Sequence, residues 1–306
     1  MNATRILDLL VHLGVVLFLP PLLLGVINKT KAFFGGRRGP PLVQLYRDIW
    51  RLLRKDTVVS TTTTWVFRAG PVVSLATVLV AALLLPLGGA ESPLAFTGNF
   101  VLFAYLLGLG RFFTILAALD TGSPFEGMGA AREATFSALA EPALFLGLVV
   151  LARASGSLEL GGMLGGAEGT WAKAGASLVL VIVSLVVVML VENSRIPFDD
   201  PNTHLELTMI HEVMVLDHSG PMFGMILYGA AIKLLVLGSL VVNLVVPVTG
   251  ESLLLSWPLF IVGILALAVV VGVVESSMAR LRLVQVPSLL VGACLLSGFG
   301  VVMLVR

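Results

Sequence analysis

The sequence predicts an all-α polytopic membrane protein, a bundle of about eight transmembrane helices with amphipathic helices on its cytoplasmic side. Of its 306 residues, 58% are hydrophobic and only 12% are charged, whereas an ordinary soluble domain carries about 25% charged residues. The mean hydropathy, +1.03, is correspondingly high. Apolar runs of about 20 residues, the length that crosses a bilayer as a helix, recur along the whole chain.

Eight apolar runs are long enough to span the membrane at a rise of about 1.5 Å per helical residue. We expect these spans at 6–27, 69–87, 99–119, 134–153, 173–191, 221–246, 254–274 and 283–305. No internal repeat and no separate soluble segment interrupts them, so residues 1–306 should form a single integral membrane domain. Pro20 and Pro21 in the first span, and Pro142 in the fourth, should release backbone groups that neighbouring helices satisfy.

Composition also excludes several classes of function. A net charge of +1 is too small to indicate a nucleic-acid partner. The chain has one cysteine, Cys294, which cannot make an internal disulfide or a structural zinc site. It cannot hold an iron–sulfur cluster either, since such a cluster normally needs about four thiolates. We therefore expect no structural metal site and no iron–sulfur cluster on this chain.

Basic residues predict the orientation in the membrane. The segment 28–68 contains nine lysine and arginine residues against only two acidic ones, Asp48 and Asp56, so it should stay cytoplasmic. The loops then alternate, which places a loop at 120–133 and a titratable loop at 192–220 inside, and the sparsely charged loops around Glu91, Glu159 and Glu251 outside. We expect a multi-pass protein of the inner (cytoplasmic) membrane with both termini outside.

Within this basic segment, residues 40–56 have the pattern of an amphipathic helix on the membrane surface. Apolar residues at helical spacing oppose basic ones: Leu42, Leu45, Tyr46, Ile49, Leu52 and Leu53 against Arg47, Arg51, Arg54 and Lys55. One interpretation is that the arginines only reach lipid headgroups. The other is docking to a partner subunit, which the preceding basic turn with Arg37 and Arg38 favours.

Three ionisable residues fall in the middle third of the bilayer, where a charge costs at least about 2.5–3.5 kcal/mol. Counted from the inner ends of their spans, Arg111 lies about 12 Å, Glu141 about 14 Å and Lys233 about 18 Å deep. A bundle could bring them together as a compensated cluster. Such a cluster either fixes helix packing or relays protons or ions, and we favour the relay because membrane helices usually pack through small residues.

The loop at 192–220 is dense in titratable groups for so apolar a chain. It holds Glu192, Arg195, Asp199, Asp200, His204, Glu206, His211, Glu212, Asp217 and His218. Asp200 can cap a helix that starts at Pro201 and runs to about Asp217. Histidines then recur every seven residues, about 10.5 Å apart, which is too far to share a metal ion. The stripe is either a solvated polar face or a proton-conducting line.

Three stretches carry a resemblance to a known family. They read ENSRIPFDDPNTHLELTMIHEVMVLDHSGP at 192–221, GRRGPPLVQLYRDIWRLLRKD at 36–56 and TGSPFEGMGAAREATFSALAEPALF at 121–145. Together they resemble the subunit 1 family of respiratory complex I. The resemblance is to the branch found in membrane-bound nickel–iron hydrogenases, the type of formate hydrogenlyase subunit 4 and hydrogenase-4 component C, and it covers essentially the whole chain.

The match to the quinone-reducing branch of this family can be followed residue by residue. Matching positions are Glu141, Glu192, Asn193, Arg195, Pro197, Phe198, Asp199, Pro201, Glu206 and Leu207. Two departures stand out. The tyrosine-rich ending of the central motif is replaced by His211-Glu212 and Leu216-Asp217, and Lys233 lacks the glutamate that the other branch has about one turn earlier. These departures favour the hydrogenase branch over quinone binding.

The resemblance implies a subunit that anchors a peripheral electron-transfer arm and couples its redox chemistry to proton movement, without catalysis of its own. Implied partners are hydrogenase large and small subunits and iron–sulfur subunits, which would hold the nickel–iron centre and the clusters, and antiporter-like membrane subunits. The expected proton pathway comprises Glu141, Arg111, Lys233, Glu192, Asp199, Asp200, Glu206, His211, Glu212 and Asp217. Expected docking residues are Arg195, Pro197, Phe198, Arg37 and Arg38.

Two other functions remain open at this point. A quinone-site subunit of a complex I-type NADH/quinone oxidoreductase would need an apolar chamber between the first span and the 40–56 helix. A stand-alone secondary ion transporter is a weaker alternative, because it would normally show inverted repeats and paired broken helices.

Overall fold

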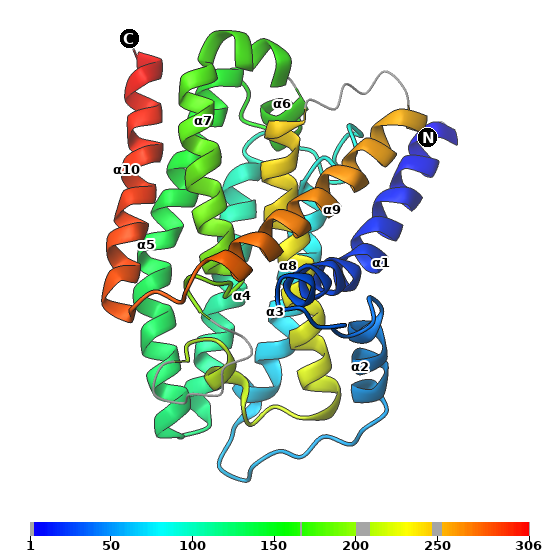
Figure 1. Ribbon diagram of the computed structural model, residues 1–306, viewed down its shortest axis with the longest axis vertical. Helices are drawn as coiled ribbons and strands as arrows, with labels where there is room; N and C mark the ends of the chain where they lie inside the picture. Colours follow the sequence, from blue (N-terminus) through cyan, green and yellow to red (C-terminus); the bar gives the residue numbers. More distant parts are fainter. Residues whose placement is uncertain (1–2, 166, 200–208, 247–252, 306) are drawn as a thin grey trace.

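The computed structural model describes residues 3–165, 167–199, 209–246 and 253–305, and over these ranges the protein is helical without a strand (Figure 1). The α-helices are α1 (Ala3–Phe34), α2 (Gln44–Leu53), α3 (Trp65–Leu84), α4 (Asn99–Asp120), α5 (Pro124–Ser155), α6 (Leu160–Gly165), α7 (Ala167–Glu192), α8 (Gly220–Val245), α9 (Leu253–Ser277) and α10 (Val286–Val305). Two short 3₁₀ helices, η1 (Glu212–Val215) and η2 (Leu283–Gln285), precede α8 and α10.

Eight of these helices are long and apolar enough to cross a membrane, which confirms the predicted all-α membrane class and its eight spans. One expectation about the loops is wrong. The cytoplasmic loop expected at 120–133 is reduced to three residues, because α5 starts at Pro124 instead of near residue 134. Proline suits the first turn of a helix, and the polar residues that follow are held by the 209–219 segment rather than by solvent.

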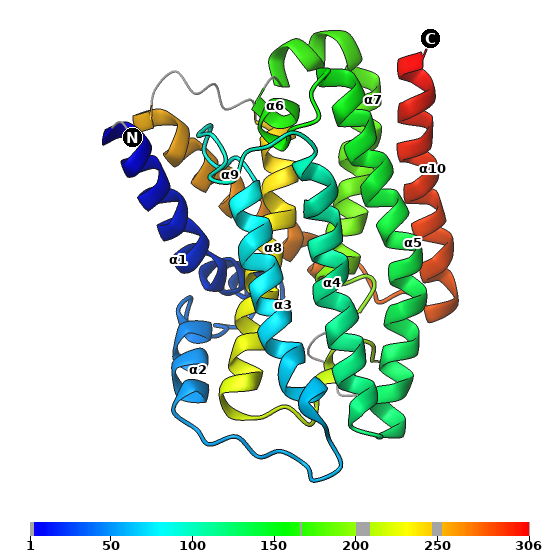
Figure 2. The same cartoon turned by 180° about the vertical axis from the view of Figure 1, so that it is seen from behind.

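Helix α8 runs through the middle of the bundle and is surrounded by α1, α2, α3, α7 and α9. Helix α4 packs against α3 on one side and α5 on the other, α5 also packs against α7, and α10 covers the outer side of α5 and α7 (Figures 1 and 2). Because neighbours enclose α8 on most sides, its apolar residues form the centre of the core together with residues such as Phe103 and Leu148. The beginning of α1 and the end of α10 lie at the same end of the bundle, opposite α2.

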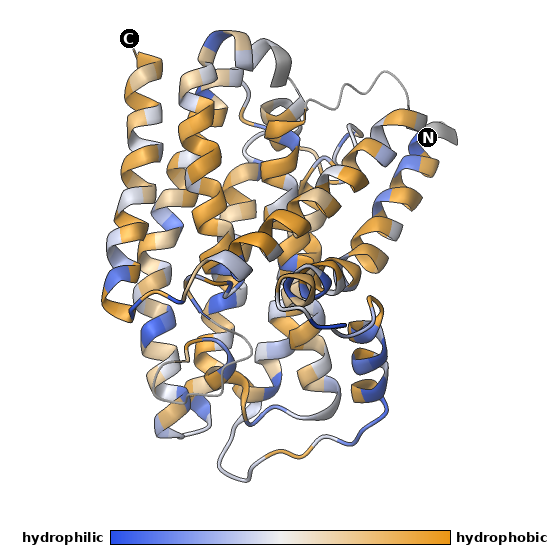
Figure 3. Cartoon of the chain, viewed as in Figure 1, coloured by the Kyte–Doolittle hydropathy of each residue, from blue (hydrophilic) through white to orange (hydrophobic). Residues whose placement is uncertain are grey.

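We call the end that holds α2 the basic end, and the opposite end the far end. Figure 3 shows apolar residues along the spans and hydrophilic residues gathered on α2 and on the loops of the basic end. Helix α2 is shorter than the predicted 40–56. It packs against α8 and α1 rather than lying apart from the bundle, and Figure 1 shows it upright beside the end of α8. The Arg54 guanidinium lies over the ring of the exposed Trp50, 4.5 Å from the ring centre.

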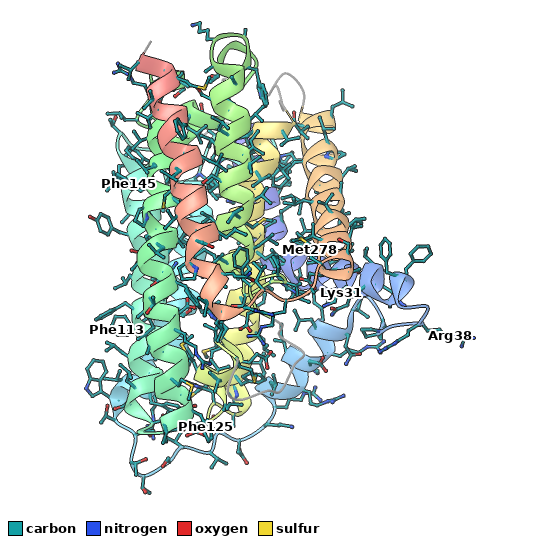
Figure 4. The ribbon with its side chains drawn as sticks, turned by 60° about the vertical axis from the view of Figure 1, so that its left-hand side comes forward. Lys31, Arg38, Phe113, Phe125, Phe145 and Met278 are labelled. Atoms are coloured by element: carbon teal, nitrogen blue, oxygen red, sulfur yellow. The ribbon has the colours of Figure 1, made fainter. Side chains whose placement is uncertain are left out.

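Helix α1 changes direction along its length, and its last part extends sideways from the bundle, with Lys31 on it (Figure 4). Pro20 and Pro21 lie inside this helix, and Pro21 offers no N–H to the Leu17 carbonyl four residues earlier. The Tyr228 hydroxyl of α8 donates to that carbonyl at 2.7 Å. The prediction that neighbouring helices satisfy backbone groups released by the prolines is therefore confirmed for Pro21.

Candidate functional site

A buried arginine collects three carboxylates in the middle of the bundle. The side chain of Arg111 on α4 is only 4% exposed. Its Nη1 lies 3.0 Å from Glu141 Oε1, its Nε lies 3.5 Å from Glu133 Oε1, and its Nη2 contacts Glu192 Oε1. Since an unpaired ion is very costly in this environment, each of these groups depends on the others.

Lys233 of α8 completes what we call the Arg111 cluster, which comprises Arg111, Lys233, Glu133, Glu141 and Glu192. Its Nζ lies 2.8 Å from Glu192 Oε2, so Glu192 is held by a different cation on each oxygen. Two cations then face three carboxylates, which gives the cluster a formal charge of −1 when every group is ionised. One additional proton makes it neutral, so the cluster has the composition of a proton acceptor.

The Arg111 guanidinium bridges two carboxylates of the same helix. Glu133 and Glu141 are eight residues apart on α5, or about 12 Å along its axis, and the guanidinium lies between them. Gly108 of α4 leaves room for Glu141, because a Cβ at position 108 would lie 3.3 Å from its Oε1. The structure thus brings together Arg111, Glu141 and Lys233, the three residues that the sequence places at mid-membrane depth.

A small cavity adjoins the cluster on the side of the basic end. Its volume is about 70 Å³, enough for about two water molecules at roughly 30 Å³ each. Arg111, Glu192 and Lys233 line it, together with the polar side chains of Ser74, Thr114, Asn193 and His211. Such a lining offers the hydrogen-bond partners that ordered water requires, so the cavity can carry a proton between the cluster and the loop after α7.

A groove on the opposite side exposes Glu141. Its side chain is 53% exposed and lies in a groove of about 760 Å³ between α4 and α5. The walls are apolar and aromatic, with Tyr105, Phe112 and Phe145 among them, and Phe145 lies on the outer surface of the bundle in Figure 4. A half-exposed carboxylate inside a transmembrane segment is unfavourable against lipid, so this groove needs a polar partner.

The loop after α7 is fixed by a second set of ion pairs. Arg195 Nη1 lies 3.3 Å from Glu275 Oε1, and Lys31 Nζ lies 2.7 Å from Glu275 Oε2. The Glu275 side chain, at the end of α9, is completely buried. Figure 4 shows Met278, just after α9, beside Lys31. The loop is therefore tied to α1 and α9 through a single carboxylate.

Asp199 organises the other side of this loop. Its Oδ1 lies 2.8 Å from Arg280 Nη2, and its Oδ2 accepts hydrogen bonds from the backbone N–H groups of Ile210 (3.2 Å) and His211 (3.1 Å). His211 Nδ1 in turn lies 3.6 Å from Glu133 Oε2. A chain of polar contacts thus runs from the end of α9, through the loop, to the Arg111 cluster.

The prediction of a helix over 201–217 is wrong for residues 209–217, the part of this range that the structure describes. Residues 209–211 are irregular, and only Glu212–Val215 form a short 3₁₀ helix. Asp199 takes the N–H groups of Ile210 and His211, and the segment packs so closely on α5 that a Cβ at Gly129 would lie 2.8 Å from Ile210 O. Asp200, Pro201, His204, Glu206 and Leu207, named from the sequence, lie outside the described residues.

His211 and His218 do not share one helical stripe, so the proposed line of histidines is not formed by these two. His218 stacks on Phe67, with ring centres 4.0 Å apart, and its Nε2 lies 3.4 Å from the Phe67 carbonyl oxygen. Burial lowers the pKa of His218 below its ordinary value. This histidine is therefore a neutral packing element beside α3, while His211 faces the cluster.

Other predicted site residues lie elsewhere than expected. Glu192, assigned to the loop, sits in the cluster at the end of α7. Arg195, Pro197 and Phe198, expected to dock a partner, are buried within this chain, because the Glu275 ion pair and the core enclose them. They shape the loop without forming its surface.

Exposed groups remain at the basic end. Asp217 is exposed and donates its N–H to the buried Glu126 at 3.1 Å, Glu212 is half-buried, and Arg37 and Arg38 are exposed. At this end, they are the charged groups of the predicted site that a partner can reach among the residues that the structure describes.

Sequence reasoning missed several members of these networks, namely Glu126, Glu133, Lys31, Glu275 and Arg280. A signal existed for Glu133, since it precedes Glu141 by eight residues and so lies near the same face of a helix. Among the described residues, no group of three or more His, Cys, Asp or Glu side chains could hold a metal ion.

Comparison with known proteins agrees with the resemblance seen in the motifs. Formate hydrogenlyase subunit 4 of Escherichia coli (strain K12) is 35% identical over 277 residues, which cover 88% of this chain and 89% of that protein. Hydrogenase-4 component C of the same organism is 34% identical over 274 residues, covering 88% and 86%. A subunit of the NADH-quinone oxidoreductase of Bordetella avium (strain 197N) is 28% identical over 210 residues, covering 65% and 58%.

The fold is also found in a solved structure. A chain of the membrane-bound sulfane sulfur reductase, an archaeal respiratory membrane complex, matches with a TM-score of 0.83 over 98% of this chain and 99% of that chain, at 19% identity. The family model of NADH dehydrogenase matches residues 7–306. The chain therefore belongs to the NADH dehydrogenase family, of the complex I subunit 1 type.

Proposed function

We propose that this chain is the membrane-anchoring and proton-coupling subunit of a membrane-bound nickel–iron hydrogenase complex of the formate hydrogenlyase type. The greater identity and coverage of the two hydrogenase-type relatives support this branch over the quinone branch. The chain changes no bonds itself. The nickel–iron centre and the iron–sulfur clusters belong to hydrogenase large, small and iron–sulfur subunits.

The observation that carries the proposal is the Arg111 cluster. Glu192 lies between two cations, and Glu141 reaches from Arg111 into an open groove. A small change in the loop that holds His211 alters the field at Glu133 and hence the balance of these pairs. Such a cluster passes a proton only when its ion pairs rearrange, which is the property that coupling to redox chemistry needs.

The basic end is the docking side for the redox arm in this proposal. The buried Arg195, Pro197 and Phe198 set the shape of the loop, and Asp199 ties it to η1. The exposed Asp217, Arg37 and Arg38 contact the arm directly. Movement of the arm would then reach the cluster through the Asp199–His211–Glu133 contacts.

The groove around Glu141 is the place for an antiporter-like membrane subunit. Its aromatic walls suit a neighbouring transmembrane helix, and a polar or protonatable side chain on that helix would satisfy the exposed carboxylate. The proton would leave this chain at that contact. The complex sits in the inner membrane, with the basic end on the cytoplasmic side and both termini outside.

The quinone alternative is disfavoured by the packing of α1 on the segment before α2. Gly25 of α1 lies against the backbone of Leu42, so that a Cβ at position 25 would be 2.1 Å from Leu42 O. Tyr46 of α2 also donates to the Phe18 carbonyl of α1. These contacts fill space between the first span and the 40–56 segment, where a quinone tail would have to lie.

Mass spectrometry of the intact complex, purified through this chain, tests the proposal. Hydrogenase large and small subunits should be present, and the complex should evolve or oxidise hydrogen with a one-electron dye. Inhibitors of quinone sites should leave this activity unchanged. Stoichiometric bound quinone together with quinone-dependent activity would instead assign the chain to the complex I branch.

A further inference from the structure

The far end of the bundle contains a cavity with polar and charged side chains in its lining, separate from the Arg111 cluster. Two cavities of about 440 and 520 Å³ adjoin there and share Gly89, Ala90, Glu91 and Ser92. These residues belong to the loop after α3, which Figures 1 and 2 show between α1, α9 and α6. We call the two cavities together the far vestibule. An exposed ion pair of Arg5 with Glu91, 3.3 Å long, lies at its edge.

His12 of α1 lines this vestibule and is 1% exposed. Its Nε2 lies 3.1 Å from the Ala82 carbonyl oxygen on α3. Because a carbonyl only accepts, Nε2 carries the hydrogen and Nδ1 has a free lone pair. Among the described residues, neither His12 Nδ1 nor the buried Ser92 Oγ has a hydrogen-bond partner. Two such atoms beside one cavity indicate a site for water.

The charged groups around His12 are few. Asp8 is one helical turn before it on α1 and also lines the vestibule. Trp257 of α9 meets the imidazole edge-on, with ring centres 6.4 Å apart, and its Nε1 lies 3.5 Å from Asp8 Oδ1. Glu91, in the loop after α3, also lines the vestibule and is paired with Arg5. Asp8 is therefore the nearest anionic group on the same face of α1, well placed to stabilise an imidazolium.

Helix α3 connects this histidine to the Arg111 cluster. The cavity beside Lys233 extends to Val78, and Ala82 is one turn further along the same helix, about 6 Å away. On the neighbouring helices, Phe103 of α4 lies one turn from Leu107 and Leu237 of α8 lies one turn from Lys233, both toward the far end. Leu107 and Lys233 line the cavity. Ala82, Phe103 and Leu237 are almost completely buried. These three residues form an apolar layer between the far vestibule and the cavity beside Lys233.

We propose that His12 is a proton relay between the far vestibule and the Arg111 cluster, so that this chain has its own opening to the far side of the membrane. The Nδ1 lone pair takes a proton from vestibule water, and the resulting imidazolium, stabilised by Asp8, releases its Nε2 proton inward. Transfer of the remaining Nδ1 proton to Nε2 through bridging water, an exchange of tautomers within the residue, restores the starting state with no net change in His12. The apolar layer closes the path at rest, since such constrictions exclude water.

This inference rests on the proposed proton coupling and adds a route through the chain beside the contact at Glu141. A purely structural His12 would only tie α1 to α3 through Ala82. His12→Gln separates the two roles, because its amide nitrogen can still donate to the Ala82 carbonyl but cannot titrate. Ser155→Ala, at the same end of the bundle and outside the vestibule lining, is the matched control.

The first measurements use the full chain in lipid vesicles. With ¹⁵N-labelled histidine, a resonance that is lost in His12→Gln should shift when only the pH on the far side is lowered. In a Cys294→Ser background, Ala90→Cys should react with a charged thiol reagent from the far side, and Phe103→Cys should not. A His12 resonance that never responds to that pH overturns the proposal.

The second measurement uses the complex. His12→Gln should fold with an unchanged Tm and lower the protons translocated per hydrogen, while Ser155→Ala stays at the wild-type ratio. Normal translocation in His12→Gln, beside a loss in Glu141→Gln, overturns the relay and leaves the proposed function standing. Normal translocation in both variants overturns the proposed coupling itself.

Discussion

Lys233 of α8 pairs with Glu192 of α7 across 2.8 Å, on the carboxylate oxygen that Arg111 does not contact. Removing the lysine leaves two negative charges in excess around one arginine, and breaking a buried pair typically costs about 3–5 kcal/mol. Lys233→Met should therefore strongly lower the Tm and the yield of assembled complex. Adding Glu192→Gln returns the formal charge of the cluster to −1 and should recover part of the loss. If the double variant is less stable than Lys233→Met, the charge balance is not what holds these helices.

Glu141→Gln removes the titration of the groove carboxylate and keeps its size and hydrogen bonding. Glutamine still offers an oxygen to Arg111, and Arg111 keeps its pairs with Glu133 and Glu192. Assembly should stay largely intact, and proton translocation per turnover should fall. Translocation is read with a pH-sensitive dye in sealed vesicles. Loss of assembly with normal coupling in the surviving complex would show that this pair only fixes packing.

Asp199→Asn keeps an oxygen for the Ile210 and His211 N–H groups but removes the charge that holds Arg280. The loop should loosen, which weakens attachment of the peripheral arm or slows its turnover. Arg195→Ala should act in the same direction, because Glu275 then keeps only Lys31. Co-purification of the arm and dye-linked hydrogen turnover measure both effects. Arg282 is exposed and lies two residues from Arg280. As a control, Arg282→Ala should leave both the co-purification of the arm and the hydrogen turnover unchanged.

Acid should destabilise the packing of α3 against the start of α8. Burial beside Phe67 lowers the pKa of His218, while its backbone contact and Asp217 act in the opposite direction. The unfolded chain binds the proton below about pH 6.5, and the folded chain binds it only at lower pH. The stability from this group is therefore complete above that pH and is lost as the pH falls through the folded pKa. His218→Phe keeps the ring stack, so its Tm should fall less between about pH 7.5 and 5.5 than that of the unmodified chain. An equal fall in both would assign the acid sensitivity to other groups.

Topology can be measured by thiol labelling in a Cys294→Ser background. Cysteines placed at Asn2 and after Arg306 should react with an impermeant reagent from the outer face of intact cells, because the basic segment 28–68 keeps the other end inside. Ser60→Cys at the basic end should react only after permeabilisation. The reverse pattern would invert the orientation of the whole bundle.

The sequence was most informative where a single physical effect dominates. Long apolar runs locate all eight spans, and the common depth of Arg111 and Glu141 anticipates their contact. Prediction failed where distant groups compete with a local pattern. The helix signal after Pro201 does not persist to Asp217, because the Asp199 carboxylate takes N–H groups of that segment. Glu133 was missed because it lies among polar residues that resemble a loop, and only the folded α5 shows that it faces Arg111.

The contact of Gly25 with Leu42 has a consequence for how such subunits diverge. A methyl group at position 25 would meet a backbone oxygen, which cannot rotate away as a flexible side chain can. Any larger residue there must move the segment before α2 outward and widen the gap beside α1. The width of that gap is therefore set by one hydrogen atom on one helix, and a single substitution at a site with no chemistry of its own would be enough to begin opening a chamber.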